Sequence, residues 1–174
     1  MDKLAKYKIH YAGLKEGIHE LEYQLNQEFF DLFEHPLVQG ANIHIKLNLD
    51  KKSNMLILDF KAIGTVHVEC HRCLEEFEMN LDVRKAIIVK TSGTENDADD
   101  VEVVIADNEN EINIAQHLYD FISLDIPIKI VHPDKENGES GCDPEILKKM
   151  EPFMVKHQQD SDPRWDILKN INSN

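Results

Sequence analysis

The feature that most constrains the fold is an alternation of apolar and polar residues along the middle of the chain. It is clearest in residues 43–49, where an isoleucine or leucine occupies every second position. Successive side chains of a strand point to opposite faces, so this run predicts a strand with one buried and one solvent-exposed face. Residues 50–54 have turn composition, and 55–60 read as the returning strand of a hairpin, which we expect to continue past a bulge at Gly64 to Val68.

Further strands are predicted on both sides of this hairpin. Residues 77–83 alternate again and 85–90 read as a separate short strand, while weaker patterns predict strands at 7–11, 18–25 and 101–105. Strands that follow one another through short turns favour an antiparallel β-meander, which we expect to be barrel-like.

Helix start signals precede several short apolar stretches. The predicted helices are 27–33, 114–124, 143–150 and a last short one after Asp162. Asn26 and Asn113 are placed to cap the first two, and an Asp-Pro pair opens each of the others. We therefore predict an α+β fold in a single domain, residues 1–174, in which the sheet packs with a few short helices and the C-terminus is helical.

Composition limits the class of protein. The chain has 174 residues, of which 41% are hydrophobic, enough for one domain with its own core. No apolar run approaches the roughly 20 residues of a membrane helix, and the N-terminus has no hydrophobic signal segment. Three cysteines, an odd number, favour reduced thiols in a cytoplasmic protein.

The net charge of −14 bears on the partners of the chain. Lysine and arginine that displace counterions supply much of the affinity of proteins for nucleic acid, so this charge argues against broad RNA binding. Two interpretations stay open: a solvated surface without a specific role, or attraction to a basic partner such as a ribosomal protein.

The residues most suited to a metal are Cys70 and Cys73, two thiols at a tight turn between strands. A structural zinc site needs two further ligands, and the downstream loop offers His132 and Cys142, which would complete a Cys3His set. The alternative is a turn with three reduced thiols and no metal. Two histidines near the turn compete as ligands: His67 and His71.

Catalytic chemistry has little support in the sequence. A redox Cys-x-x-Cys opens a helix, whereas this one is followed by an alternating strand. No glycine-rich phosphate loop and no nucleophile motif occurs, so we predict that the protein is not an enzyme. Near the C-terminus, Trp165 suits either packing or a partner contact, and Arg164 suits either an acidic group or an RNA phosphate.

Three motifs together resemble the YceD-like family: Cys-His-Arg-Cys-Leu-Glu-Glu-Phe at 70–77, Asp-Ile-Pro at 125–127 and Asp-Pro-Arg-Trp-Asp-Ile-Leu at 162–168. The resemblance covers most of the chain. It implies a small bacterial cytoplasmic protein needed for accumulation of the large-subunit ribosomal RNA, with plastid relatives and no known catalytic activity. Many members resemble a four-cysteine arrangement. Here Cys142 stands where they have a second Cys-x-x-Cys, and His132 is the available substitute.

We therefore expect a non-enzymatic ribosome-biogenesis factor that supports synthesis, processing or stability of the large ribosomal RNA. Its expected partner is a basic ribosomal protein or a pre-ribosomal particle, with no membrane and no small-molecule substrate, and direct RNA contact stays open. The predicted partner-binding residues are Arg72, Arg164 and Trp165. The alternative is a thiol redox protein, or a structural zinc-binding interaction module, that uses Cys70 and Cys73.

Overall fold

The computed structural model describes residues 4–33, 38–91, 103–104, 109–136 and 138–153. Contacts divide the chain into two units, Met1–Gly141 and Cys142–Asn174, and each is described by itself. The first unit contains η1 (Ala5–Tyr7), β1 (Lys8–Ile9), β2 (Gly17–Asn26), α1 (Gln27–Phe30), β3 (Gly40–Lys51), β4 (Met55–Glu69), β5 (Glu76–Lys90), β6 (Val103–Val104), β7 (Ile112–Asn113) and α2 (Ala115–Asp125). The second contains α3 (Pro144–Met150) and η3 (Glu151–Phe153).

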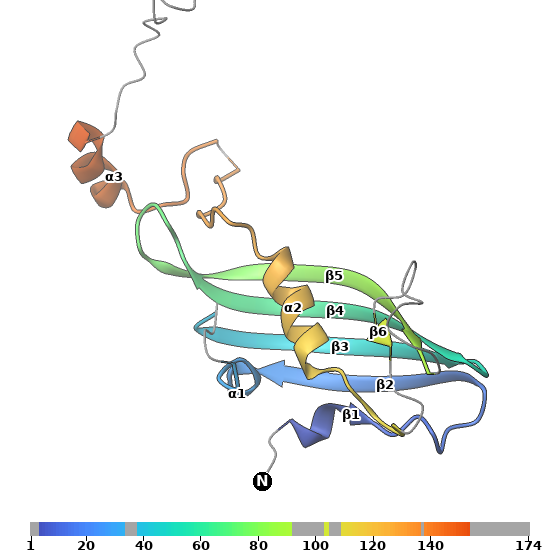
Figure 1. Cartoon of the computed structure of the whole chain (residues 1–174). Helices are drawn as coiled ribbons and strands as arrows, with labels where there is room; N and C mark the ends of the chain where they lie inside the picture. Colours follow the sequence, from blue (N-terminus) through green and yellow to red (C-terminus); the bar gives the residue numbers. More distant parts are fainter. Residues whose placement is uncertain (1–3, 34–37, 92–102, 105–108, 137, 154–174) are drawn as a thin grey trace, which may run out of the picture. The chain divides into compact units, whose positions relative to one another are not determined.

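Strands β2 to β5 form an antiparallel meander in which each strand pairs with the next in sequence (Figure 1). Strand β6 extends this sheet by pairing in parallel with the end of β5, and β1 pairs with β7 in a separate two-stranded sheet. The predicted α+β meander is confirmed. The barrel-like closure is wrong, because the described strands leave β2 and β6 as the two edges of an open sheet, whereas a barrel needs its first and last strands to pair.

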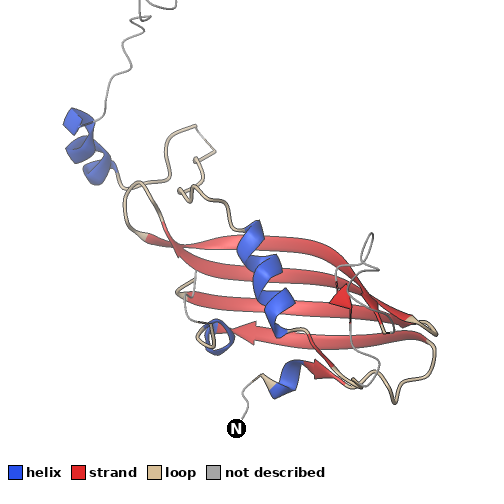
Figure 2. Ribbon diagram, in the orientation of Figure 1, coloured by secondary structure: helices blue, strands red, loops and turns tan. Residues whose placement is uncertain are grey.

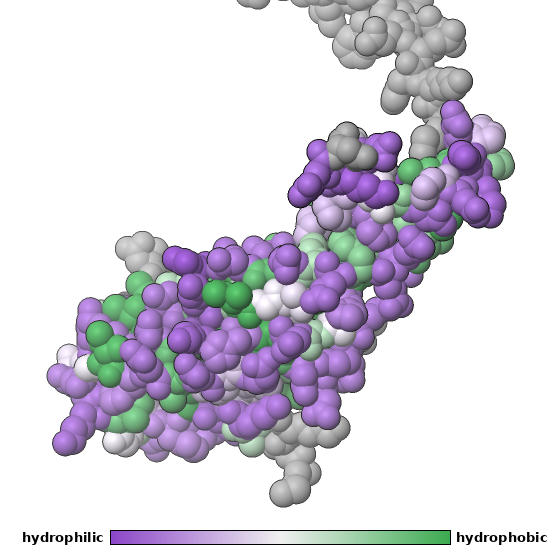
Figure 3. All heavy atoms as spheres, turned by 180° about the vertical axis from the view of Figure 1, so that it is seen from behind, coloured by the Kyte–Doolittle hydropathy of each residue, from purple (hydrophilic) through white to green (hydrophobic). Residues whose placement is uncertain are grey.

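The core lies on one face of this sheet. The apolar residues of the clearest predicted strand (Ile43, Ile45, Leu47 and Leu49) are all at most 1% exposed, and each contributes about 1.5–3 kcal/mol through burial. Helix α2 crosses the sheet (Figure 2). Its buried residues Leu118 and Ile122 belong to the same core cluster as the sheet residues. From behind, the molecule is mostly hydrophilic with smaller hydrophobic areas (Figure 3), as expected for a sheet with one solvated face.

Gly64 corrects another prediction. It is not a bulge, because it pairs in regular register with Ile43 on one side and Leu81 on the other. A Cβ at Gly64 would lie 2.6 Å from the Cα of Ile43 and would collide with the carbonyl oxygen of Asn42. Glycine is therefore required here by the close approach of β3.

Several element boundaries also differ from the prediction. The strands predicted at 77–83 and 85–90 are one strand, β5, because its pairing with β4 continues across the junction even though residues 84–86 are all exposed. The first predicted strand is only Lys8–Ile9, and α1 ends at Phe30 without a side-chain cap from Asn26. Of the strand predicted at 101–105, the structure describes only β6.

The two later helices are confirmed. The backbone N–H of Ala115, the first residue of α2, donates to Oδ1 of Asn113 at 3.0 Å. Asn113 therefore caps the helix from one residue before Ile114, which occupies the N-cap position itself. In the second unit, Oδ1 of Asp143 accepts from the backbone N–H of Glu145 at 2.8 Å and caps α3. The helix predicted after Asp162 lies outside the described residues.

Candidate metal centre

The Cys-x-x-Cys motif forms the connection between β4, which ends at Glu69, and β5, which begins at Glu76. Two backbone hydrogen bonds close this turn: the N–H of Cys70 donates to the carbonyl of Glu75 at 2.9 Å, and the N–H of Leu74 to the carbonyl of Cys70 at 2.8 Å. Leu74 has a φ of 61°, a left-handed conformation that costs a non-glycine residue about 1 kcal/mol or more. The turn thus holds both thiols at the end of the two longest strands.

The segment after α2 is attached to this turn. The N–H of His71 donates to the carbonyl of Ile130 at 2.8 Å, and Nδ1 of His71 lies 3.4 Å from the N–H of Ile130. Two residues later, the ring of His132 packs on Phe77 of β5 with centroids 4.4 Å apart. These contacts bring His132 to the Cys-x-x-Cys turn although it is 59 residues beyond Cys73 in the sequence.

Close packing positions the last ligand residue. A Cβ at Gly141 would lie 3.1 Å from the Cβ of His132 and would collide with the carbonyl oxygen of Pro133. Next to Gly141, the hydroxyl of Ser140 is 3.0 Å from Nη1 of Arg72, which donates to it. Cys142 follows directly in the chain and is 1% exposed.

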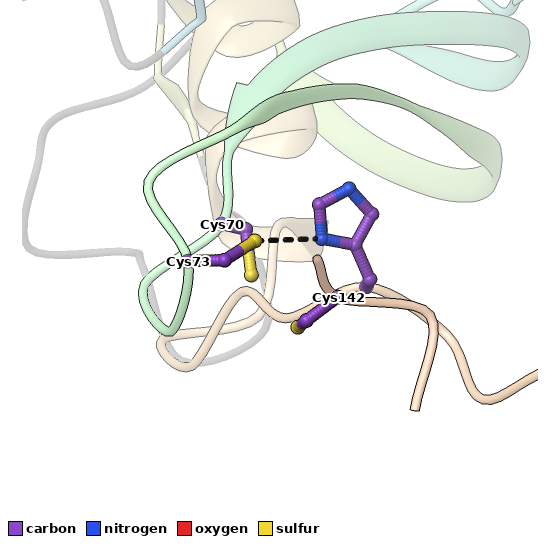
Figure 4. Close-up of side chains that lie close together, drawn as sticks. Cys70, Cys73 and Cys142 are labelled. Carbon is purple, nitrogen blue, oxygen red and sulfur yellow. Dashed lines mark hydrogen bonds between the residues drawn. The ribbon is translucent and has the colours of Figure 1, made fainter. Parts of the chain in front are cut away.

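The four predicted ligand residues gather as one cluster (Figure 4). One ligand atom from each of Cys70, Cys73, His132 and Cys142 lies within 4.8 Å of all the others, and Sγ of Cys73 is 3.3 Å from Nδ1 of His132. Tetrahedral zinc, with bonds of about 2.3 Å to sulfur and 2.0–2.1 Å to nitrogen, puts neighbouring ligand atoms about 3.5–3.8 Å apart. The cluster therefore has the donor set of a structural zinc site, and its ligand atoms lie within about 1 Å of the spacing that tetrahedral zinc requires.

The surroundings of Cys70 favour its thiolate. Burial raises the pKa of the Cys70 thiol, but backbone N–H groups of Cys73, Arg72 and His132 donate to its sulfur and outweigh burial, with a further contribution from the Cys73 side chain, lowering the pKa to about 5. A metal-bound cysteine must be deprotonated, so these donors prepare Cys70 as a ligand.

The other predicted site residues do not join the cluster. Nδ1 of His71 accepts a hydrogen bond from the backbone N–H of Ile130, and His67 is an exposed residue of β4. Arg72 contacts Ser140, so it helps to hold the loop that leads to Cys142. Arg164 and Trp165 lie outside the described residues. Sequence reasoning missed the role of Gly141, which only the proximity of His132 and Pro133 reveals.

Together these features define the class: an α+β protein in which an open antiparallel sheet carries a Cys3His cluster at the turn between its two longest strands. Comparison with family models then places it. The model described as large ribosomal RNA subunit accumulation protein YceD matches residues 58–172, and the chain belongs to this family. All four cluster residues lie inside the match. Membership implies a role in accumulation of the large-subunit ribosomal RNA.

Two other comparisons gave no match, since neither a curated protein nor a solved structure resembles the chain closely enough. Among the described helices, none has the length and apolarity needed to cross a membrane.

Proposed function

We propose that the protein is a non-enzymatic, cytoplasmic ribosome-assembly factor that acts by binding a basic ribosomal protein or a pre-ribosomal particle. The observation that carries this proposal is the family match over residues 58–172. The net charge of −14 supports a basic protein surface as the contact in preference to bare RNA.

We further propose that the Cys3His cluster binds zinc and that the zinc is structural. Catalytic zinc keeps one coordination position open for water or substrate, whereas the cluster supplies four protein ligands. All three thiols are buried, so a metal held there is shielded from substrate. Bound zinc would fix the β4–β5 turn to the segment around His132.

The alternative to a zinc-binding assembly factor is a protein with a thiol redox function. The lowered pKa of Cys70 fits a redox thiol and a zinc ligand equally well. Two other observations favour zinc: Cys70 and Cys73 are buried at 0% and 2% exposure, and two further ligands complete the set. The redox function requires both thiols to react with a disulfide such as oxidised glutathione at neutral pH, and we expect the zinc-loaded protein to be unreactive.

The cellular function is tested by deleting the gene and measuring large- and small-subunit ribosomal RNA and the ribosomal subunit profile. We expect the ratio of large- to small-subunit RNA to fall, and a plasmid copy of the gene to restore it. An unchanged ratio together with a normal subunit profile would rule out the proposed function.

The type of partner is tested by sedimentation of the native protein with ribosomal particles. We expect co-sedimentation at low salt and release as salt rises, because contacts between exposed charges are screened. Co-sedimentation that is removed by ribonuclease while the ribosomal proteins remain associated would show that RNA, not protein, is the contact.

A further inference from the structure

Among the residues that the structure describes, no strand pairs with one edge of the sheet beside the metal centre. Strand β5 pairs with β4 along its full length, from Glu76 to Lys90. On its other side, the only pairing among the described residues is that of β6 with Val89 and Lys90. Within the described chain, the outer edge of β5 up to Ile88 therefore presents backbone N–H and C=O groups that are available to an added strand.

A pocket of about 280 Å³ lies along the start of this edge. One wall is residues 77–80 of β5 and the other is the segment after α2, with the lining side chains Phe77, Met79, Pro127, Ile130, Val131 and Pro133 mainly apolar. The volume is just below the 300–1,000 Å³ typical of small-molecule sites, so it suits one or two apolar side chains better than a whole ligand. Ile128, between two lining residues, is 98% exposed.

The solvent-facing side of the same edge is acidic. Glu76 and Glu78 are exposed, and Glu76 lies directly opposite Glu69 of β4. Like charges in directly opposed positions of a sheet are unfavourable. Neither Glu76 nor Glu78 forms an ion pair within the described part of the chain, so a cation from outside would relieve this repulsion. Of the described residues that line the pocket, Lys129 is the one with a basic side chain.

The two faces of β5 would each contact a different set of side chains in an extended segment that pairs with this strand. Because successive side chains of a strand alternate between faces, an extended segment added to β5 would direct every second side chain toward the face of Phe77 and Met79. The intervening side chains would lie on the face of Glu76 and Glu78. Apolar residues fit the first set of positions and basic residues the second.

We propose that this groove, the β5 groove, binds an extended segment of a basic protein in which lysine or arginine alternates with apolar residues. The proposal rests on the proposed function, for which it names the contact surface. The opposite sheet edge at β2 fits such a segment less well. Its pocket also has apolar residues and Glu20, but Lys8, His10 and His19 line it as well, and Glu22 on the same strand already pairs with Lys46 at 3.6 Å.

The metal centre holds one wall of the β5 groove in place. His132 lies between two residues that line the pocket and packs on Phe77, and Ile130 is tied to the Cys-x-x-Cys turn through His71. Zinc bound to His132 would thus fix the distance between the two walls. We expect removal of zinc with a chelator to weaken binding to the groove by about fivefold or more.

The test uses the full chain and three fluorescent peptides of about ten residues, which at roughly 3.3 Å per residue span most of β5. In the first peptide lysine alternates with valine and leucine, in the second lysine alternates with serine, and in the third glutamate alternates with valine and leucine. Fluorescence anisotropy gives the Kd of each. We expect the first peptide to bind about tenfold or more tightly than either of the others.

Two pairs of exposed residues supply matched variants. Ile128→Lys and Glu78→Lys alter the β5 groove, whereas Ile18→Lys and Glu20→Lys make the same changes at the β2 edge. We expect each groove variant to weaken the first peptide by about threefold or more, through loss of an apolar contact or of a charge attraction, and each control to leave its Kd unchanged. Because all four side chains are exposed, the variants should fold normally.

Equal binding of the three peptides, no binding, or equal losses in the groove and control variants would overturn the proposal. The proposed function is judged separately by co-sedimentation. Co-sedimentation without peptide preference leaves the assembly role standing and removes the β5 groove. Peptide binding without co-sedimentation keeps the groove as a peptide site and removes the assembly role.

Discussion

A single methyl group at Gly141 should weaken the metal centre without touching a ligand. The Cβ of an alanine there would lie 3.1 Å from the Cβ of His132 and would collide with the carbonyl oxygen of Pro133. The obstructing oxygen belongs to the backbone, which cannot rotate away as a flexible side chain does. The substitution Gly141→Ala must therefore displace either the His132 segment or the segment that leads to Cys142.

The size of the effect follows from the tolerance of metal sites. Relief of the collision needs a shift on the order of 1 Å, whereas metal–ligand distances are held within about 0.2 Å. Changes to the residues that support metal ligands typically cost 10–100-fold in affinity. We expect Gly141→Ala to lower zinc affinity by this factor, equivalent to about 1.4–2.7 kcal/mol.

The assay is competition for zinc against a colorimetric chelator, with the wild type and two variants. Gly13→Ala is the matched control, because a Cβ at Gly13 would have no neighbour within 4 Å. We expect the control to bind zinc as the wild type does. If Gly141→Ala retains wild-type affinity, the packing of Gly141 does not position His132 and Cys142, and the reasoning fails.

Three further predictions concern the thiols and the sheet. Replacing Cys70 and Cys73 together by serine should abolish zinc binding. It should lower the free energy of unfolding by no more than about 3 kcal/mol, because the hydrophobic core does not include these cysteines. In zinc-finger peptides, by contrast, folding depends on a zinc-binding free energy of about 10–16 kcal/mol. Complete unfolding of that variant by circular dichroism would contradict this. In zinc-free protein, the Cys70 thiol should lose its proton near pH 5. The thiolate is measured by its ultraviolet absorbance, which a Cys70→Ser variant should lack. If the Cys70 thiol instead titrates near pH 9, the backbone donors do not lower its pKa. Gly64→Ala should cost about 3 kcal/mol or more in urea unfolding, since its Cβ meets the backbone of Ile43, and a loss below about 0.5 kcal/mol would exclude the close approach.

The strands could be predicted from the sequence because their burial has a period of two. The apolar positions of residues 43–49 face the core as expected, and the alternation in β4 and β5 located the turn that holds Cys70 and Cys73. Whether the sheet closes depends on how its edges meet in space. Local patterns carry no information on this, so the barrel-like prediction failed.

The candidate site divides in the same way. Residue type and position selected Cys70, Cys73, His132 and Cys142, because the chain has three cysteines and His132 is the histidine that shares a loop with Cys142. The β5 groove joins two segments about 50 residues apart in the sequence, and Gly141 packs on His132 and Pro133 across a loop, so both contacts become visible only in the folded chain.

The central claim, that the Cys3His cluster binds structural zinc, is tested most directly by elemental analysis of the native protein. The protein should be purified without a metal-affinity tag or added metal, alongside the variant with serine at positions 70 and 73. We expect about one zinc per wild-type chain and almost none in the variant. A zinc content near zero in the wild type, with the thiols still reduced, would contradict the claim.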